Sequence, residues 1–152
     1  MACVECLSVP LGSVLGVFTL LVLNRAVSEA IVQPKSGDLK KRMKKLLFIC
    51  SYNINRSVTA EWMYDGVPAY VVRSAGTEEG SRFVLTKEHV QWADIIFVME
   101  PCHLQTLQQR FGEDLAGKKV HCLHIPDIYE FLEPALMAEL KTKLKPYVQV
   151  PA

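Results

Sequence analysis

Short apolar runs alternate with helix-favouring stretches along the chain from residue 43 onward. The apolar runs are typical of buried strands, because they are short and rich in β-branched or aromatic residues. They lie at residues 46–49, 70–72, 94–99 and 119–124. Helices are predicted between and after them, at residues 58–64, 86–92, 101–110 and 134–145. Strands that alternate with helices predict an α/β domain, with a four-stranded parallel sheet and helices on both faces.

Single residues support this assignment. Thr86 is a good N-cap residue, and Pro101 suits the first turn of a helix. Trp62 and Trp92 fall on the apolar stripes of their helices, so we expect both in the core. In open parallel sheets the ligand lies beyond the carboxyl ends of the strands. Cys50 follows the first strand directly and therefore marks that edge of the sheet.

The first 42 residues differ in character from the rest. Residues 6–24 carry no charge and are borderline in length and composition for a membrane-spanning helix. If they span, the basic cluster just before the domain keeps the remainder in the cytoplasm. The alternatives are an extension without a fold of its own, preceding a true start at Met43, and a cleaved signal that lacks the usual basic beginning. We therefore divide the chain into an N-terminal extension, residues 1–42, and a domain, residues 43–152.

Composition narrows the classes of function. Half of the 152 residues are apolar, and the formal net charge is +1. The domain carries 12 Lys or Arg and 13 Asp or Glu, so nothing indicates nucleic-acid binding. The five cysteines are odd in number and too sparse for a disulfide scaffold, which favours a reducing compartment such as the cytoplasm. His121 and His124 are three apart in a predicted strand and face opposite sides, so no metal site is expected.

The loop from Cys50 to Ser57 carries the main chemical signal. It connects a predicted strand to a predicted helix, so its N–H groups and the helix dipole favour an anion without any lysine. Arg56 adds a planar guanidinium that suits two phosphate oxygens. The same positive potential favours the thiolate of Cys50, which is a nucleophile toward phosphorus. Asn53 suits a left-handed position in a tight loop, and Ser57 can donate a hydrogen bond to the sulfur.

This loop resembles the signature of the low-molecular-weight protein tyrosine phosphatases, Cys-x5-Arg-Ser with Asn three places after the Cys. The resemblance continues through Arg73–Thr77, Thr86–Glu88, Met99–Glu100 and Ile125–Asp127, and it is strongest to a shortened bacterial branch. It implies a flavodoxin-like three-layer phosphatase fold. It also implies hydrolysis of phosphotyrosine or another aryl phosphate ester through a phosphocysteine intermediate, with no metal and no cofactor.

The resemblance assigns roles to individual residues. Cys50, Arg56 and Asp127 are the expected catalytic residues, with Asp127 as general acid and later general base. Tyr129 and Glu100 are expected at the rim of the substrate site. Phosphate is expected to bind along the loop, at Ser51, Tyr52, Asn53, Ile54, Asn55, Arg56 and Ser57. Asn53, Ser57 and Ser74 are expected to support the loop.

The chain also departs from the pattern of that family. Asn55 stands where a typical member has a second cysteine, so a disulfide that protects the nucleophile from oxidation is missing. The segment between Thr77 and Thr86 is much shorter than usual, which removes part of the substrate-side wall. The usual Asp-Pro-Tyr is replaced by Asp127–Tyr129 with isoleucine in the middle, so the acid and the tyrosine keep their spacing.

Other functions stay open at this point. The altered acid turn and the short wall also fit a non-catalytic module that binds phosphate or a phosphoprotein. An arsenate reductase on the same fold needs two further cysteines close together, whereas Cys102 and Cys122 are 20 apart. A phosphocarrier has no need of Arg56 and Ser57 together. For a phosphatase the partner is a phosphorylated protein or a small phosphate ester, a membrane contact would involve only residues 6–24, and the oligomeric state is not predicted.

Overall fold

A sheet of four parallel strands forms the middle of the part of the chain that the structure describes. This is a computed structural model, and it describes residues 42–151. The strands are β1 (Lys44–Cys50), β2 (Tyr70–Gly76), β3 (Ile95–Val98) and β4 (Lys119–Cys122), paired in the order β2-β1-β3-β4. The helices are α2 (Arg56–Tyr64), α3 (Lys87–Trp92), α4 (Pro101–Phe111) and α5 (Pro134–Leu144), with a 3-10 helix at Gly112–Leu115. The predicted α/β class and parallel sheet are confirmed.

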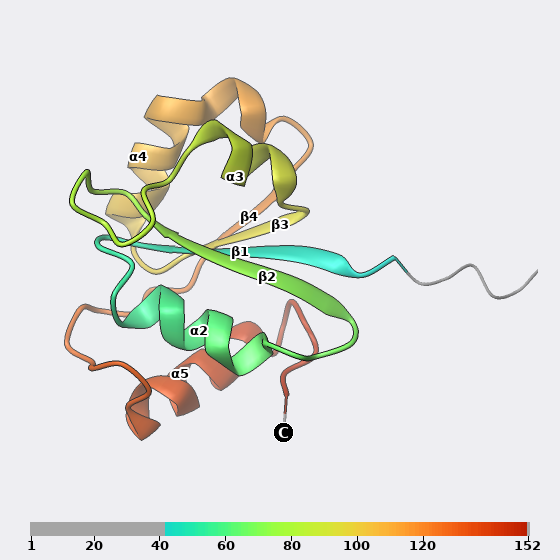
Figure 1. The fold of residues 1–152 in the computed structure, drawn as a ribbon, viewed down its shortest axis with the longest axis vertical. Coiled ribbons are helices and arrows are strands. Elements are labelled where there is room, and N and C mark those ends of the chain that lie inside the picture. Colours follow the sequence, from blue (N-terminus) through green and yellow to red (C-terminus); the bar gives the residue numbers. More distant parts are fainter. Residues whose placement is uncertain (1–41, 152) are drawn as a thin grey trace, which may run out of the picture. The chain divides into compact units, whose positions relative to one another are not determined.

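Different helices cover the two faces of the sheet, with α2 and α5 on one side and α3 and α4 on the other (Figure 1). Side chains alternate along β1, so neighbouring leucines enter different layers. Leu46 belongs to a buried cluster that includes residues of α2 and α5. Leu47 belongs to a second cluster with residues of α3 and α4. The two clusters hold the three layers together and fix the carboxyl end of β1, where Cys50 lies.

Several elements have ends that differ from the prediction, and β1 begins two residues earlier, at Lys44. β2 continues to Gly76, because its last residues pair with β1 as far as Cys50. α2 begins at Arg56, two residues earlier than expected. β4 ends at Cys122, and two residues later His124 has a φ of 53° that a strand does not accommodate. The longer β2 and the earlier α2 both bring more of the chain to the edge where Cys50 lies.

The two tryptophans have different environments. The prediction for Trp62 is wrong, because its side chain is 56% exposed. The face of α2 that meets the sheet carries Ala60, Met63 and Tyr64 instead. Trp92 packs against the core cluster on its side of the sheet, and the guanidinium of Arg73 lies 4.4 Å from its ring centroid.

The predictions made for the N-terminal extension, including the membrane segment at residues 6–24, lie outside the described residues. Between residues 42 and 151, no helix has the length and apolar character needed to cross a membrane.

Candidate active site

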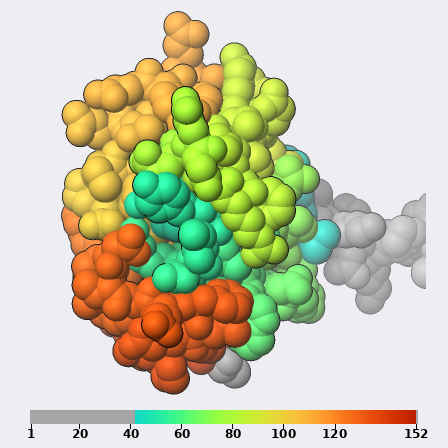
Figure 2. Space-filling model, turned by 60° about the vertical axis from the view of Figure 1, so that its left-hand side comes forward, coloured from blue at the N-terminus to red at the C-terminus, as the bar shows by residue number. Residues whose placement is uncertain are grey.

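The loop after β1 and the turn after β4 form one small pocket. It has a volume of about 100 Å³ and is lined by Cys50, Tyr52, Ile54, Asn55, Arg56 and Asp127. The loop turns tightly because Asn53 has a left-handed φ of 54°, and the first turn of α2 contains no acidic residue. The unpaired N–H groups of that turn therefore favour an anion in the pocket. Figure 2 shows the loop (teal) at the surface, between the segment after β2 (yellow-green) and the C-terminal part of the chain (orange).

A chain of hydrogen bonds ends on the sulfur of Cys50, which is buried. The Cys50 Sγ lies 3.0 Å from Oγ of Ser57. Nδ2 of Asn53 donates both to Ser57 Oγ, at 2.9 Å, and to Ser74 Oγ, at 2.7 Å. Ser74 in turn donates to the carboxylate of Glu61 at 2.5 Å. Because Ser57 accepts from Asn53, its own hydrogen is left to donate to the sulfur, and this stabilises a thiolate.

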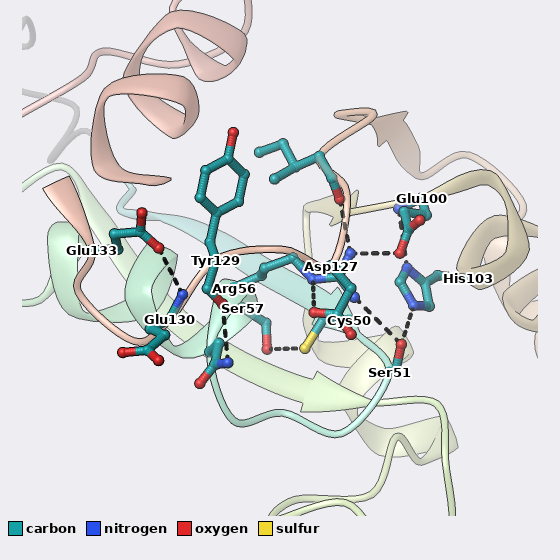
Figure 3. A network of polar contacts seen from close by, with 12 residues as sticks. Cys50, Ser51, Arg56, Ser57, Glu100, His103, Asp127, Tyr129, Glu130 and Glu133 are labelled. Carbon is teal, nitrogen blue, oxygen red and sulfur yellow. Dashed lines mark hydrogen bonds and ion pairs between the residues drawn. The ribbon is translucent and has the colours of Figure 1, made fainter. Parts of the chain in front are cut away.

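One edge of the Arg56 guanidinium is held by Glu100 and Ile125, and the other edge faces the pocket. Its side chain is 1% exposed, and Nη1 donates to Glu100 at 2.5 Å and to the carbonyl of Ile125 at 2.8 Å (Figure 3). Nε pairs with Asp127 at 3.0 Å, and Nη2 lies 3.4 Å from Ser51 Oγ. The Nε–Nη2 edge is therefore directed at the pocket, where it can bind two oxygens of one phosphoryl group.

Asp127 lies at the mouth of the pocket on a turn that is tied to the loop. Its side chain is 57% exposed. Nδ2 of Asn55 donates to the carbonyl of Tyr129 at 3.0 Å, and the N–H of Leu132 donates to Thr59 Oγ1 at 3.0 Å. These two bonds join the turn to the phosphate loop and to α2, so the position of the carboxylate is set by the same loop that holds Cys50.

Glu100 and Tyr129, expected at the rim, are both half-buried and are not among the residues that line the pocket. Glu100 is the ion-pair partner of the buried Arg56. The ring of Tyr129 packs against the core cluster, and its hydroxyl donates to Glu139 of α5 at 3.4 Å. The exposed apolar side chains near the pocket are Tyr52, Ile54 and Ile128, which are 52%, 60% and 74% exposed.

The segment after β2 supports the loop through its backbone. The N–H groups of Thr77, Glu78 and Arg82 donate to the carbonyls of Cys50, Ser51 and Tyr52, at 3.0, 3.1 and 3.1 Å. This segment is the shortened one, and these three hydrogen bonds hold it against the loop.

Two residues at the site were not predicted, Glu61 and His103. Glu61 ends the hydrogen-bond chain from Cys50, and His103 lies 2.9 Å from Ser51 Oγ. Burial lowers the pKa of His103 below its usual range, and the Arg56 guanidinium lowers it further. A sequence signal exists for His103 alone, since it is a polar residue at the third position of a helix, where capping contacts are common.

One group of possible metal ligands occurs in the described part of the chain, formed by Glu100, Cys102 and His103. Both ring nitrogens of His103 already make hydrogen bonds, to Ser51 and to the N–H of Glu100. The carboxylate of Glu100 is paired with Arg56. The group is therefore part of the support of Arg56 and of the loop, and we assign no metal to it.

Comparison with known proteins gives matches to solved structures. No protein-family model matches the sequence, and a search of curated proteins finds no match either. An arginine phosphatase, YwlE from Geobacillus stearothermophilus, is 25% identical, with a TM-score of 0.53 over 67% of this chain and 88% of its own.

Two further structures extend the comparison. Wzb from Vibrio vulnificus, solved in complex with benzylphosphonate, is 25% identical, with a TM-score of 0.53 over 68% of this chain and 93% of its own. A low-molecular-weight protein tyrosine phosphatase from Streptococcus pyogenes is 15% identical, with a TM-score of 0.56 over 70% of this chain and 95% of its own. At this identity the last match shows the fold alone.

Proposed function

We propose that this chain, whose described residues have the fold of the low-molecular-weight protein tyrosine phosphatases, is a metal-independent cysteine phosphatase. The observation that carries the proposal is the single pocket lined by Cys50, Arg56 and Asp127, a nucleophile, a phosphate ligand and an acid. The activity is assigned to residues 43–152, because every residue involved lies there.

The first step transfers the phosphoryl group to the enzyme. The Cys50 thiolate attacks phosphorus, the bond from phosphorus to the ester oxygen breaks, and Asp127 gives its proton to that oxygen. The carboxylate of Asp127 occupies Nε of Arg56 in this structure. A bound phosphoryl group takes that place, and this frees the carboxyl group for the leaving oxygen. Arg56 and the loop N–H groups stabilise the equatorial oxygens of the transition state.

The second step releases phosphate. Asp127, now a carboxylate, removes a proton from water, and the water oxygen attacks the phosphocysteine. The sulfur–phosphorus bond breaks, and the Cys50 thiolate returns to the hydrogen bond from Ser57. The hydrogen-bond chain from Ser57 through Asn53 and Ser74 to Glu61 makes the sulfur a better leaving group, since it stabilises the negative charge.

The surroundings of the pocket favour an aryl phosphate, such as phosphotyrosine in a protein. Tyr52, Ile54 and Ile128 offer exposed apolar surface beside the phosphate site. No cationic or anionic side chain other than Arg56 and Asp127 lines the pocket in the described part of the chain. Benzylphosphonate, the ligand of the Vibrio structure, combines the same two features, an aromatic ring and a phosphonate.

Phosphoarginine is the second candidate, because YwlE from Geobacillus stearothermophilus, at 25% identity, is an arginine phosphatase. A guanidinium leaving group would favour several acidic side chains at the rim, whereas Asp127 is the one carboxylate among the described residues that line the pocket. Turnover of phosphotyrosine and phosphoarginine peptides of the same sequence separates the two substrates directly.

The proposal is tested on p-nitrophenyl phosphate. Cys50→Ser is expected to abolish turnover, and Asp127→Asn is expected to lower kcat by roughly 100-fold or more. The pH–rate profile of the wild type is expected to have a basic limb that the Asp127→Asn protein lacks, because only the wild type has a general acid at this position. Vanadate binding without turnover by the wild type would instead indicate a phosphate-binding module.

We also propose a cytoplasmic location, because the mechanism needs a reduced nucleophile. Cys50 must stay reduced, and Cys102 and Cys122 are also free thiols. Fractionation of cells that express the full chain checks this, and recovery in an oxidising compartment would contradict it.

A further inference from the structure

His103 bridges the phosphate loop and the beginning of α4. It is the third residue of the helix, and only 2% of its surface is exposed. Its Nδ1 lies 3.0 Å from the backbone nitrogen of Glu100, and its Nε2 lies 2.9 Å from Oγ of Ser51. Figure 3 shows the ring between these two residues.

The bridge fixes which ring nitrogen carries the hydrogen. A backbone N–H can only donate, so Nδ1 must accept from Glu100. Burial and Arg56 lower the pKa of His103, against the opposing effect of Glu100, Asp127 and Glu78, so the ring is neutral near pH 7. The one ring hydrogen is therefore on Nε2, and it is donated to Ser51 Oγ.

The hydroxyl group of Ser51 is then left with a hydrogen to give. Its oxygen accepts from Nε2 of His103, and Nη2 of Arg56 approaches the same oxygen at 3.4 Å. Two donors at one hydroxyl oxygen use both lone pairs, so its O–H group needs an acceptor elsewhere. Nη2 belongs to the edge of Arg56 that is directed at the phosphate pocket. An oxygen of a phosphoryl group bound by Arg56 is the acceptor within reach.

We propose that His103 is a positioning residue that orients the Ser51 hydroxyl as a hydrogen-bond donor to the bound phosphoryl group. The proposal rests on the proposed function for its role in turnover, whereas the effect on phosphate binding does not depend on it. In the transition state the negative charge on the equatorial oxygens is spread, and a fixed donor there lowers the barrier. His103 contacts no substrate itself and acts through Ser51.

The competing explanation is that His103 only caps α4. A cap at this position accepts a hydrogen bond from the N-cap N–H, and a glutamine does this as well as a histidine. A glutamine can also donate to Ser51 through its amide, whereas a leucine of similar size can do neither. Comparison of His103→Gln with His103→Leu therefore separates the effect of losing the two hydrogen bonds from the effect of replacing the histidine.

The experiment measures phosphate binding and p-nitrophenyl phosphate turnover for wild type, Ser51→Ala, His103→Leu, His103→Gln and the double variant Ser51→Ala/His103→Leu. Inorganic phosphate is the ligand in the binding assay, and Tm is recorded for each protein. We expect Ser51→Ala and His103→Leu each to lower kcat by about 10- to 100-fold and to weaken phosphate binding. The double variant should match Ser51→Ala alone, and His103→Gln should recover most of the loss.

Two results would overturn the proposal. One is a double variant whose loss is the product of the two single losses, because His103 would then act independently of Ser51. The other is a His103→Leu protein with a lower Tm but unchanged kcat and phosphate affinity, which a purely structural cap predicts. If the wild type binds phosphate but turns over no substrate, the proposed function fails while the binding comparison still tests the bridge.

Discussion

At the scale of single residues, Asn55 departs from the loop signature of the phosphatase family and makes a contact of its own. The sequence indicates only that a protective cysteine is missing at this position. In the structure the amide of Asn55 donates to the carbonyl of Tyr129, two residues after Asp127. The side chain therefore couples the phosphate loop to the acid turn. This turn lacks the proline that is usual in the family, and the hydrogen bond from Asn55 restricts its conformation instead.

Replacing Asn55 by alanine is expected to impair the acid more than the nucleophile. One hydrogen bond contributes about 1 kcal/mol, which corresponds to about a fivefold change in rate. The loss should be larger for phenyl phosphate than for p-nitrophenyl phosphate, because phenolate is the poorer leaving group and depends more on the acid. Steady-state kinetics on both esters measures the difference.

Ile54→Ala is the matched control for that comparison, since Ile54 lines the same pocket but has no bond to the acid turn. It should slow both esters to a similar extent. If Asn55→Ala slows both esters by the same factor, Asn55 has no role in placing Asp127.

At the scale of elements, the carboxyl end of β2 is packed directly against the phosphate loop. Gly76 pairs with Cys50 in the sheet, and the residues after it donate to the loop carbonyls. A Cβ on Gly76 would lie 2.2 Å from Oγ of Ser81 and 2.5 Å from the carbonyl oxygen of Ser51. The serine side chain could move aside, but the carbonyl oxygen belongs to the backbone of the phosphate loop, so a larger residue would displace the loop.

Gly76→Ala should therefore destabilise the domain and disturb the anion site together. We expect a loss of about 1–3 kcal/mol in the free energy of unfolding, typical of overpacking, together with weaker phosphate binding. Gly112→Ala is the control, because a Cβ there meets no atom within 4 Å and the residue has a helical φ of −52°. It should leave binding unchanged and stabilise by about 0.4–1 kcal/mol. Urea unfolding measures the stability of both variants. Equal unfolding midpoints for Gly76→Ala and Gly112→Ala would contradict the close contact at Gly76.

The elements also show what the sequence could and could not predict. The order of strands and helices followed from local patterns, and so did the loop with Cys50 and Arg56. The end of β2 was missed, because Arg73 to Gly76 become strand through pairing with β1 rather than through their own preferences. Trp62 was misplaced because α2 is short and its buried face is chosen by the sheet. Glu61 and His103 reach their partners only across the fold, so no local pattern marks Glu61 at all.

At the scale of the described domain, near-neutral charge leaves the anion site to local geometry, and one buried and two half-buried histidines contribute to the dependence of stability on pH. Burial is the main cause that lowers the pKa of His103, His121 and His89. His121 also stacks on Tyr147, with ring centroids 4.0 Å apart. Each ring resists protonation in the folded protein, whereas in the unfolded chain it takes up a proton near its ordinary pKa of about 6.5.

The sign of the pH dependence follows from this difference. Between the folded and the unfolded pKa the unfolded chain binds more protons, so stability rises with pH in that window and falls as the solution becomes more acidic than about pH 6.5. A second loss is expected at lower pH. Hydrogen bonds to Thr86 and to Gln91 are the main causes that lower the pKa of Glu88 and Asp114, and their contribution disappears only as these carboxylates become protonated. We therefore expect two separate decreases in the free energy of unfolding as the pH falls, first from the histidines and then from the carboxylates.

Urea unfolding of the wild type at about pH 7.5, 6, 5 and 3.5 measures both steps. His103→Gln should flatten the decline between about pH 7 and 5, because glutamine cannot take up a proton and keeps both hydrogen bonds of the bridge. The step at lower pH should be unchanged, since Glu88 and Asp114 are untouched. A wild-type stability that stays constant or rises from about pH 7 to 5 would show that the histidines are not held neutral by the fold. An equally steep decline in His103→Gln would assign the first step to other groups.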